Sequence, residues 1–422
     1  PAVAPYLEVC CPCAAHVPKA KLSRRRFLAR VATTSLATQL PAKLGAVEAA
    51  ALVGPTTPPP AAGITADTLA AAEQLAALQF TPAQREPLVK SVADRVATYP
   101  ALRATPVSNE VFPALSFDPR LGGVRPPEGP VARLGVTWRP PDFNRPADAT
   151  DLAFASVAEL SALLHSRQVT SRELTELSLA RLKRYDPVLT AVVTLTEERA
   201  LRQADAADAE IRAGRWRGPL HGVPWGAKDL LAVRGYPTTW GAAQFKNRHF
   251  DTDAEVVRRL DGAGAVLVAK LSLGALANGD TWFRGQTKCP WNLATGSSGS
   301  SAGPCAAVSA GLVPFAIGSE TLGSIVSPCT HNAVTGLRPT YGRVSRTGAM
   351  SLAWSMDKLG PIARSAEDCA LVFDAIHGAD PGEPTSVDAP FAWPPAASVR
   401  GRRIGFLASQ LDQRNEWHAT NQ

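Results

Sequence analysis

Residues 318–325 form a turn whose composition suits a serine nucleophile. The sequence there is Gly-Ser-Glu-Thr-Leu-Gly-Ser-Ile, and it follows an apolar run that ends at Ile317. A serine in such a turn can present its hydroxyl beside several backbone N–H groups, which together supply a nucleophile and an oxyanion hole. The turn is therefore a candidate site for acyl-transfer chemistry.

A serine nucleophile needs a base, and no histidine of this chain suits that task. His221 and His331 are the nearest candidates, and neither lies beside a carboxylate in the sequence. Lysine can act as a base where burial lowers its pKa. Lys228 ends the stretch Gly222–Lys228, which we expect to form an apolar strand, so it is a candidate for such burial. The ordinary interpretation of this lysine, a surface charge, stays open at this point.

A second glycine- and serine-rich stretch covers residues 296–303, with the sequence Gly-Ser-Ser-Gly-Ser-Ser-Ala-Gly. Small residues at this density let the backbone pass close to other backbone and to a ligand. Such runs are more often linkers. A linker would not lead directly into the apolar helical segment that begins at Pro304, so we favour a site.

The elements around these segments alternate between helices and buried strands. Ser156 and Thr170 each precede a glutamate by three residues, the pattern of a capping box, and an amphipathic helix follows each one. Residues 265–269 and 313–317 are short apolar runs that we interpret as strands covered on both faces. This alternation predicts an α/β fold with a mainly parallel sheet.

Four motifs of this chain together resemble the amidase signature family. They occur in the order and spacing of that family, and the resemblance runs from about Asp151 to the end of the chain. The family fold is a mixed, largely parallel sheet covered by helices on both faces. The motifs are G-V-P-x-x-x-K-D at 222–229, G-S-S-x-G at 299–303, G-S-x-T-x-G-S-I at 318–325, and G-L-R-P-T-Y-G-R-V-S at 336–345.

The resemblance implies a catalytic relay of Ser324, Ser300 and Lys228. Ser324 is the expected nucleophile, Ser300 the bridging serine and Lys228 the base, and the peptide between Gly299 and Ser300 is expected to be cis. Neutral Lys228 takes the Ser300 proton while Ser300 takes that of Ser324, which attacks the amide carbon. The implied activity is hydrolysis of a carboxamide C–N bond through an acyl-enzyme, without cofactor or metal.

The resemblance also implies supporting groups. The backbone N–H groups of Thr321, Leu322, Gly323 and Ser324 are expected to stabilise the oxyanion. We expect Ser301 and Ser319 to be hydrogen-bond donors that keep Lys228 neutral and oriented, with plain turn residues as the alternative interpretation.

Three positions depart from the common family pattern. Leu322 replaces a frequent glycine, Glu320 replaces the usual Asp, and Val326 stands where many members have arginine. No catalytic group is lost, but the missing arginine separates this chain from members that use it to bind substrate.

The front of the chain carries most of its net charge of +7. Residues 1–50 hold seven Lys or Arg against two acids, so the remainder is close to neutral and gives no electrostatic argument for binding nucleic acid. Ser-Arg-Arg-Arg-Phe-Leu at 23–28 resembles a twin-arginine export signal over 23–50, with a basic surface helix as the alternative. We expect export to the periplasm or cell exterior, with the cytoplasm as the alternative. Residues 1–22 are an uncertain leader or a miscalled start, because the chain begins at Pro1.

The remaining boundaries follow from composition. Residues 51–64 are a Pro- and Ala-rich linker, and 65–150 are a helical extension with a further linker. Helices are expected over 65–78 and 81–99, the second with Thr81 as N-cap and Pro82 at its first position. The family resemblance implies that residues 151–422 form an amidase signature domain, which we expect to be truncated, since family members usually continue well beyond the strand predicted at 402–407.

The seven cysteines show no paired C-x-x-C arrangement of the zinc type. We interpret Cys289, Cys305, Cys329 and Cys369 as small buried hydrophobes.

Two other functions remain open at this stage. One is the A subunit of a tRNA-dependent amidotransferase, against which the near-neutral body and the export-like leader both argue. The other is a catalytically silent binding or scaffold relative, which retention of the whole relay disfavours. The expected partner is a small-molecule amide, with no nucleic acid and no stable membrane anchor, and a homodimer is an option.

Overall fold

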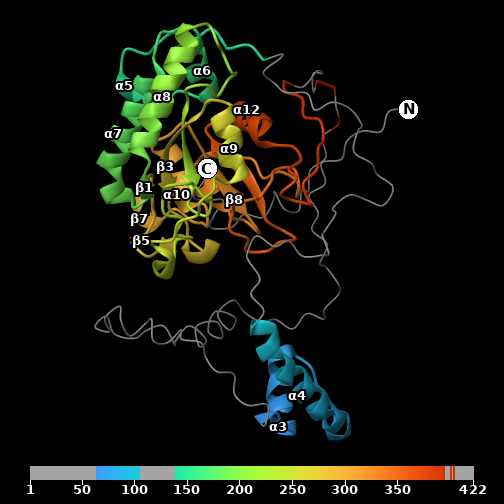
Figure 1. Cartoon of the computed structure of the whole chain (residues 1–422). Helices are drawn as coiled ribbons and strands as arrows, with labels where there is room; N and C mark the ends of the chain where they lie inside the picture. The colour runs from blue at the N-terminus through green and yellow to red at the C-terminus, as the bar shows by residue number, and fades with distance from the viewer. Residues whose placement is uncertain (1–62, 105–137, 395–399, 402, 404–422) are drawn as a thin grey trace. The chain divides into compact units, whose positions relative to one another are not determined.

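The computed structural model describes residues 63–104, 138–394, 400–401 and 403 (Figure 1). The predicted leader and export signal lie outside these residues, as do the linker up to residue 62 and the strand expected at 402–407 apart from residue 403. The chain divides into two units, Pro1–Pro106 and Val107–Gln422, and each is described by itself.

The first unit contains the two predicted helices, α3 (Ala66–Ala76) and α4 (Pro82–Ala104). The α4 helix begins at the expected proline and runs five residues beyond the predicted end. The two helices are joined by an ion pair of 2.8 Å between Arg85 Nε and Glu73 Oε1. Glu73 is the buried residue of α3, so this ion pair holds the helical hairpin together.

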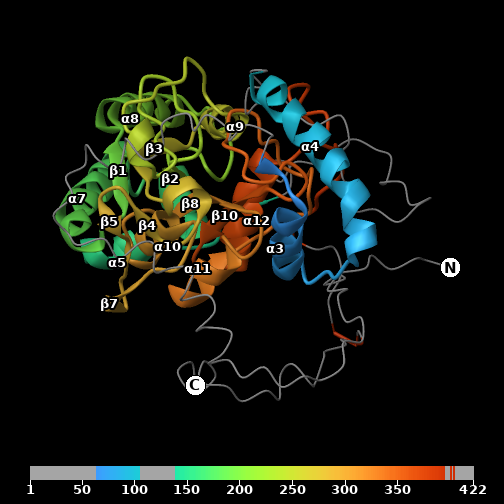
Figure 2. The same ribbon diagram turned by 90° about the horizontal axis from the view of Figure 1, so that it is seen from below.

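The second unit is built on a mixed six-stranded sheet in the order β1-β3-β2-β8-β10-β9. The β2 strand pairs in parallel with β3 and β8, whereas the pairs β1–β3, β8–β10 and β10–β9 are antiparallel. Figure 2 shows the first five of these strands side by side in this order. The strands are β1 (Val192–Leu195), β2 (Pro224–Lys228), β3 (Val266–Leu271), β8 (Phe315–Glu320), β9 (Thr335–Gly336) and β10 (Lys358–Ala363).

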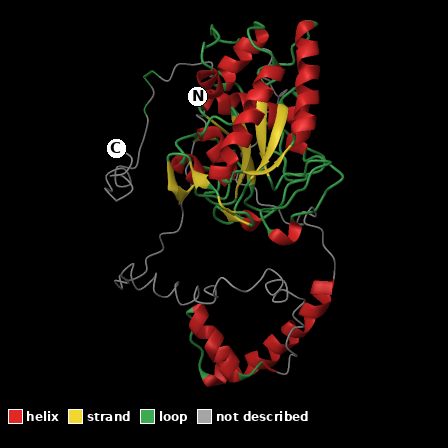
Figure 3. Cartoon of the chain, turned by 90° about the vertical axis from the view of Figure 1, so that its left-hand side faces the viewer, coloured by secondary structure: helices red, strands yellow, loops and turns green. Residues whose placement is uncertain are grey.

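Helices cover both faces of this sheet, as predicted (Figure 3). They are α5 (Ala149–Phe154), α6 (Val157–His165), α7 (Ser171–Leu189), α8 (Glu197–Arg212), α9 (Glu255–Gly262), α10 (Ala302–Ser309), α11 (Val326–His331) and α12 (Ala366–Ile376). Two short hairpins lie beside the sheet, β4 (Thr281–Trp282) with β5 (Gly285–Gln286) and β6 (Lys288–Cys289) with β7 (Asn292–Gly296), and two 3₁₀ turns cover Ala243–Phe245 and Ala275–Ala277. In the described residues, no helix has both the length and the apolar character that crossing a membrane requires.

The core has two clusters because successive strand residues point to opposite faces of the sheet. Leu267 belongs to the first cluster, and its neighbours Val266 and Val268 belong to the second. The first cluster includes the apolar faces of α6, α9 and α12, and the second includes α10 and much of α7. The four described cysteines are free and buried, which confirms their interpretation as core residues.

Helix α6 begins with the capping box predicted at Ser156. Its hydroxyl accepts from the Glu159 N–H, and the Glu159 carboxylate accepts from the Ser156 N–H. At α7 only half of the predicted box forms. Thr170 accepts from the Glu173 N–H at 3.0 Å, but the Glu173 carboxylate pairs with Arg145 instead of returning to the N-cap.

The first helices of this unit are anchored by residues far along the chain. Arg364 donates to Ala155 O at 2.6 Å and to Ala153 O at 3.3 Å, at the end of α5. Asp368 accepts from the Ala158 N–H at 3.1 Å, in the first turn of α6. These contacts tie α5 to the residue that follows β10 and α6 to the first turn of α12.

Strand β8 is longer than predicted. The sequence places a turn from Gly318 onward, but the strand runs to Glu320, because Ser319 and Glu320 pair with Leu359 and Lys358 of β10. Ser319 therefore lies on a rigid strand next to β2.

Candidate active site

Lys228 is the last residue of β2 and is completely buried. The β2 strand lies between β3 and β8, so the lysine is flanked by strands on both sides. The surface-charge interpretation is wrong for this residue.

The Lys228 ammonium nitrogen lies among three serine side chains. Its Nζ is 2.8 Å from Ser300 Oγ, 3.0 Å from Ser301 Oγ and 2.9 Å from Ser319 Oγ, with the Ser319 carbonyl oxygen at 3.3 Å. Ser300, Ser301 and Ser319 are all buried. The structure thus brings Lys228 together with the predicted bridging serine and with both predicted supporting serines.

The other hydrogen bonds of Ser301 determine whether it donates to Lys228 or accepts from it. Its hydroxyl donates to the Ser319 carbonyl at 3.1 Å and accepts from the Ser319 N–H at 3.2 Å. Because its only proton is used there, Ser301 accepts from Lys228. Lys228 also donates to Ser319 Oγ, so both serines accept from the lysine, whereas we expected both to donate to it. A neutral lysine that gives its two protons to Ser301 and Ser319 keeps its lone pair for the Ser300 hydroxyl.

Burial lowers the pKa of Lys228 to about 7. Asp357 and Glu320 oppose this shift through their negative charge, but only in part. The Cys305 thiol adds no charge at neutral pH, since burial raises its pKa well above the ordinary value. A substantial fraction of the lysine is therefore neutral near pH 7, as a proton acceptor must be.

The peptide bond between Gly299 and Ser300 is cis, as the family resemblance implied. Gly299 has no room for a side chain, because a Cβ there would lie 1.8 Å from the Gly279 carbonyl oxygen. Ser301 stands at the N-cap position of α10 but does not cap the helix with its side chain. Its hydroxyl is used by Lys228 and Ser319 instead.

Ser324 lies in the turn between β8 and α11 and is half-buried. Its carbonyl accepts from the Ser301 N–H at 3.1 Å, which joins this turn to the loop that carries Ser300. Within the described part of the chain, the Ser324 hydroxyl has no hydrogen-bond partner, so the structure does not link it directly to Ser300. Gly323 before it has a φ of 86°, the region that glycine adopts most readily.

The buried Glu320 carboxylate organises this turn. It accepts from the N–H groups of Gly323 at 2.8 Å, Ile325 at 2.8 Å and Val326 at 2.9 Å. Burial raises the pKa of Glu320, but these N–H donors together with Arg338 outweigh burial and leave it lowered. Glu320 is therefore charged and holds both ends of the turn around Ser324.

Glu320 changes the expected oxyanion hole. The Gly323 N–H is already bound to the Glu320 carboxylate, because the longer glutamate reaches over the turn. Among the described residues, the N–H groups of Thr321, Leu322 and Ser324 donate to no acceptor. Leu322 is not in a positive-φ conformation, so it can present its N–H as glycine would.

An ion pair lies next to the relay. Lys270 of β3 and Asp229, the residue after Lys228, are both fully buried, and Lys270 Nζ lies 2.6 Å from Asp229 Oδ1. Lys270 also donates to Thr238 Oγ1 at 2.6 Å, and Asp229 Oδ2 accepts from the Thr239 N–H at 2.9 Å. Sequence reasoning missed this pair. The only available signal was a second lysine inside an apolar strand.

The site contains no evident metal ligand set. In residues 63–104, 138–394 and the few described beyond them, no group of three His, Cys, Asp or Glu side chains is arranged to hold a metal.

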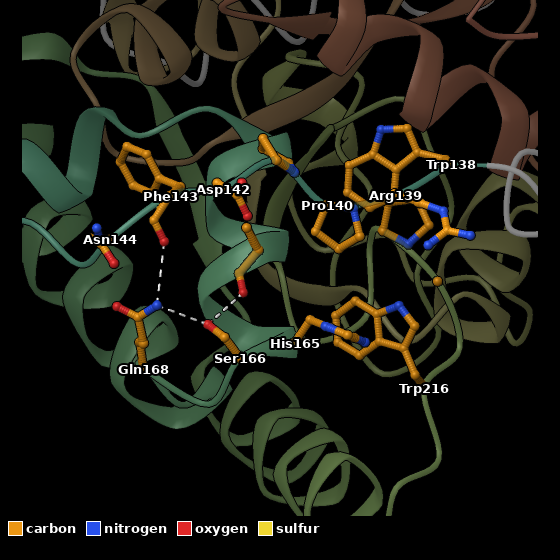
Figure 4. A pocket seen from close by; sticks show the side chains of 14 residues that line it. Trp138, Arg139, Pro140, Asp142, Phe143, Asn144, His165, Ser166, Gln168 and Trp216 are labelled. Atoms are coloured by element: carbon orange, nitrogen blue, oxygen red, sulfur yellow. Dashed lines mark hydrogen bonds between the residues drawn. The ribbon is translucent and has the colours of Figure 1, made fainter.

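A separate hollow of about 810 Å³ lies at the other end of β2 (Figure 4). Trp138, Pro140, His165 and Trp216 gather on one side of it, and Gln168 bridges Phe143 O and Ser166 Oγ on the other. Because residues 216–219 lead into the first residue of β2, whereas Lys228 is the last, this hollow is distinct from the relay.

Comparison with known proteins found a matching family model and several similar proteins. The family model described as Amidase matches residues 173–419. The A subunit of the glutamyl-tRNA(Gln) amidotransferase of Halorhodospira halophila is 44% identical over 267 residues, 61% of this chain and 55% of that protein. The corresponding protein of Methylococcus capsulatus is also 44% identical over 267 residues, with the same coverage. The chain thus spans about half the length of the curated relatives it matches.

Solved structures show the same partial overlap. The native peptide amidase of Stenotrophomonas maltophilia is 38% identical with a TM-score of 0.53, over 58% of this chain and 51% of that one. An amidase family protein of Bacillus anthracis is 32% identical with a TM-score of 0.54, over 56% of this chain and 50% of that one.

Proposed function

Because the chain belongs to the amidase family, we propose that it hydrolyses a carboxamide C–N bond through an acyl-enzyme on Ser324. The observation that carries the proposal is the contact of 2.8 Å between a fully buried Lys228 and the hydroxyl of Ser300. A lysine so placed can be neutral near pH 7, and its lone pair has a serine proton to accept.

The proposed reaction begins with two proton transfers. Lys228 Nζ accepts the Ser300 proton as Ser300 Oγ accepts the Ser324 proton. Ser324 Oγ then bonds to the amide carbon, and the carbonyl oxygen becomes an oxyanion. The relay returns a proton to the leaving nitrogen, and the C–N bond breaks to release ammonia or an amine. Water attacks the ester by the same route and releases the carboxylic acid.

Three backbone N–H groups are free to stabilise the oxyanion, those of Thr321, Leu322 and Ser324, which donate to no acceptor among the described residues. Loss of a single oxyanion donor costs roughly 3 to 4 kcal/mol of transition-state stabilisation in enzymes where it has been measured. The Gly323 N–H joins this set only if it leaves Glu320, so we assign it no part in the hole.

Mutation of the relay tests the proposal. We expect Ser324→Ala and Lys228→Ala each to abolish amide hydrolysis, and Ser300→Ala to leave a small residual rate, because Ser300 passes protons without bonding to substrate. Ser166→Ala and Lys183→Ala are the matched controls, since both residues are exposed and remote from the relay. Labelling with a fluorophosphonate should follow the same pattern. Turnover at the wild-type rate in Ser324→Ala or Lys228→Ala contradicts the assignment.

We further propose an apolar amide as the substrate. Leu322 is 80% exposed and Val326 is 40% exposed, so two apolar side chains flank Ser324. A hydrolysis screen over primary amides of increasing alkyl chain length should show a rising kcat/KM, whereas a preference for short or charged amides contradicts this.

A second candidate function is the A subunit of an amidotransferase, favoured by the identity of 44% to proteins of that name. In that case the amide donor is expected to be glutamine, and a partner protein is needed for full activity. Hydrolysis of free glutamine in preference to every alkyl amide in the screen supports this alternative.

A further inference from the structure

A cavity of about 790 Å³ opens on the second unit away from the relay. Its walls come from α5, the C-terminal half of α7, the turn between β6 and β7, and the end of α10. In Figures 1 and 2, α5, α7 and β7 lie on the same side of this unit. The lining includes three arginines and several apolar side chains, and the residues that matter most are Phe154, Arg181, Arg184, Trp291, Leu293 and Arg364.

This cavity is distinct from the catalytic site. It contains neither Lys228 nor any serine of the relay. The α10 helix separates the two places, since Ser301 precedes its first residue and Ser309 is its last. At 1.5 Å per residue, a helix of this length spans roughly 12 Å.

The walls of the cavity are largely apolar and open to solvent. Trp291 is 70% exposed, and Val188, Leu293 and Phe154 each expose between 43% and 51% of their surface. Exposed apolar side chains that gather in one hollow, unlike isolated ones, indicate a binding surface. The volume is within the range of small-molecule pockets, roughly 300 to 1,000 Å³.

Three arginines give this cavity its charge. Arg181 donates to the Gly311 and Ala310 carbonyls, and the acceptors of Arg364 among the described residues are backbone carbonyls such as Ala155 O. Arg184 contacts the ring of Tyr185. No acidic residue lines the cavity, and within the described residues none of the three arginines is paired with a carboxylate.

The arginines also act on one another. Burial lowers the pKa of Arg364 to about 10, and the nearby Arg181 lowers it further, while Asp368 and Glu159 oppose the shift from a distance. None of these three cations is paired with a described carboxylate, so together they create a positive electrostatic potential. A bound anion would be stabilised by that potential. Guanidinium groups bind carboxylates by two parallel hydrogen bonds, and they suit such an ion better than lysine does.

We infer that this cavity binds a small organic carboxylate with an apolar tail. The carboxylate lies against Arg184 at the rim, with Arg181 and Arg364 behind it, and the tail contacts Trp291 and Leu293. Binding here requires no step of the amide hydrolysis, so the inference stands independently of the proposed reaction.

Isothermal titration of the whole chain with octanoate tests this inference. We expect Arg184→Gln to weaken octanoate binding about tenfold, the loss of one charge-assisted contact, and Arg184→Glu to abolish it. Lys183→Gln is the matched control. Lys183 precedes Arg184 in the sequence, but its ammonium group pairs with Glu197 and does not line the cavity. It should bind octanoate within about twofold of the unmodified chain. 1-Octanol, which has the same tail without the charge, should bind about tenfold more weakly than octanoate.

Three results overturn the inference. The first is a complete lack of octanoate binding to the unmodified chain. The second is equal binding to Arg184→Gln and Lys183→Gln, which places octanoate at another site such as the catalytic one. The third is equal affinity for octanoate and 1-octanol, which shows that the carboxylate does not contribute to binding in this cavity. Circular dichroism of each variant, and a second variant at another lining residue, Leu293→Asp, keep a folding defect apart from a binding defect.

Discussion

Lys228 faces three serine hydroxyls without a described carboxylate in contact with it, and this decides how its charge depends on pH. A carboxylate at hydrogen-bond distance favours the ammonium form, whereas burial among hydroxyls favours the neutral amine. The described surroundings are of the second kind, with Asp357 and Glu320 acting only through their charge. Lys228 therefore suits a proton acceptor better than an ion-pair partner.

The pH dependence of hydrolysis should follow from this pKa. Lys228 is protonated and inactive below its pKa of about 7, so kcat/KM should rise through that value and reach a plateau on the alkaline side. A steady-state pH profile with an uncharged amide measures this limb. A maximum below about pH 5 indicates a carboxylate base and contradicts the assignment.

Glu320 should matter for the stability of the nucleophile turn. Glu320→Ala removes the acceptor of three buried or half-buried N–H groups, and we expect it to cost about 3 kcal/mol of unfolding free energy together with most of the activity. Urea unfolding measures the first effect and amide hydrolysis the second. Glu320→Asp should retain a folded protein, since it keeps the charge. Glu176→Ala, at an exposed residue of α7, is the control, and a Glu320→Ala variant as stable as this control contradicts the role.

At the scale of elements, the pair of Asp229 and Lys270 fixes β3 to the residue that follows Lys228. Breaking a buried pair leaves one charge without a partner, at a cost of roughly 3 to 5 kcal/mol. We expect Asp229→Asn and Lys270→Met each to destabilise by about this amount, and the double variant by clearly less than the sum. Urea unfolding of the unmodified chain, the two single variants and the double variant gives the coupling energy between Asp229 and Lys270.

The exposed pair of Lys183 and Glu197 supplies the comparison, because a surface ion pair contributes at most about 1 kcal/mol. Additive losses at Asp229 and Lys270 are the outcome that excludes a coupled pair.

Local patterns predicted the elements better than they predicted the contacts between them. The helix starts at Ser156 and Pro82, the strand over 265–269 and the chain segments of the relay all follow from spacing and from the motifs. The full length of β8 does not, because it depends on pairing with β10, some 40 residues later. The capping box at Thr170 is only half formed for a similar reason, because the Glu173 carboxylate pairs with Arg145, a residue outside the helix.

The site shows the same division. The motifs identified Lys228, Ser300 and Ser324 as the candidate relay residues. The family resemblance implied the cis peptide. Two details needed coordinates, namely that the Ser301 proton is used by Ser319 and that the Glu320 side chain is long enough to occupy the Gly323 N–H. Both depend on side-chain reach across neighbouring strands and turns, which residue spacing does not encode.

At the scale of the whole molecule, the described residues that make up both core clusters all lie from Leu152 onward, with Trp138 and Phe143 packed against the first. We therefore expect removal of residues 1–137 to change the melting temperature of the second unit by no more than about 2 °C. Removal of residues 1–155 is the matched comparison, because it also takes away the carbonyls of Ala153 and Ala155 that Arg364 binds. Calorimetry of the two shortened chains measures the difference. Equal melting temperatures contradict the anchoring role of Arg364.

Because α5 and α6 are anchored by residues far along the chain, they wait for these partners during synthesis of the protein. Arg364 and Asp368 bind backbone groups that lie 209 to 211 positions earlier in the chain. A ribosome that adds about 5 to 20 residues per second needs roughly 10 to 40 seconds to cover that interval. Throughout it, the apolar face of α6, with Val157, Leu160 and Leu164, has no α12 to pack against. The nascent chain therefore offers a chaperone a binding segment for as long as translation takes to reach Asp368.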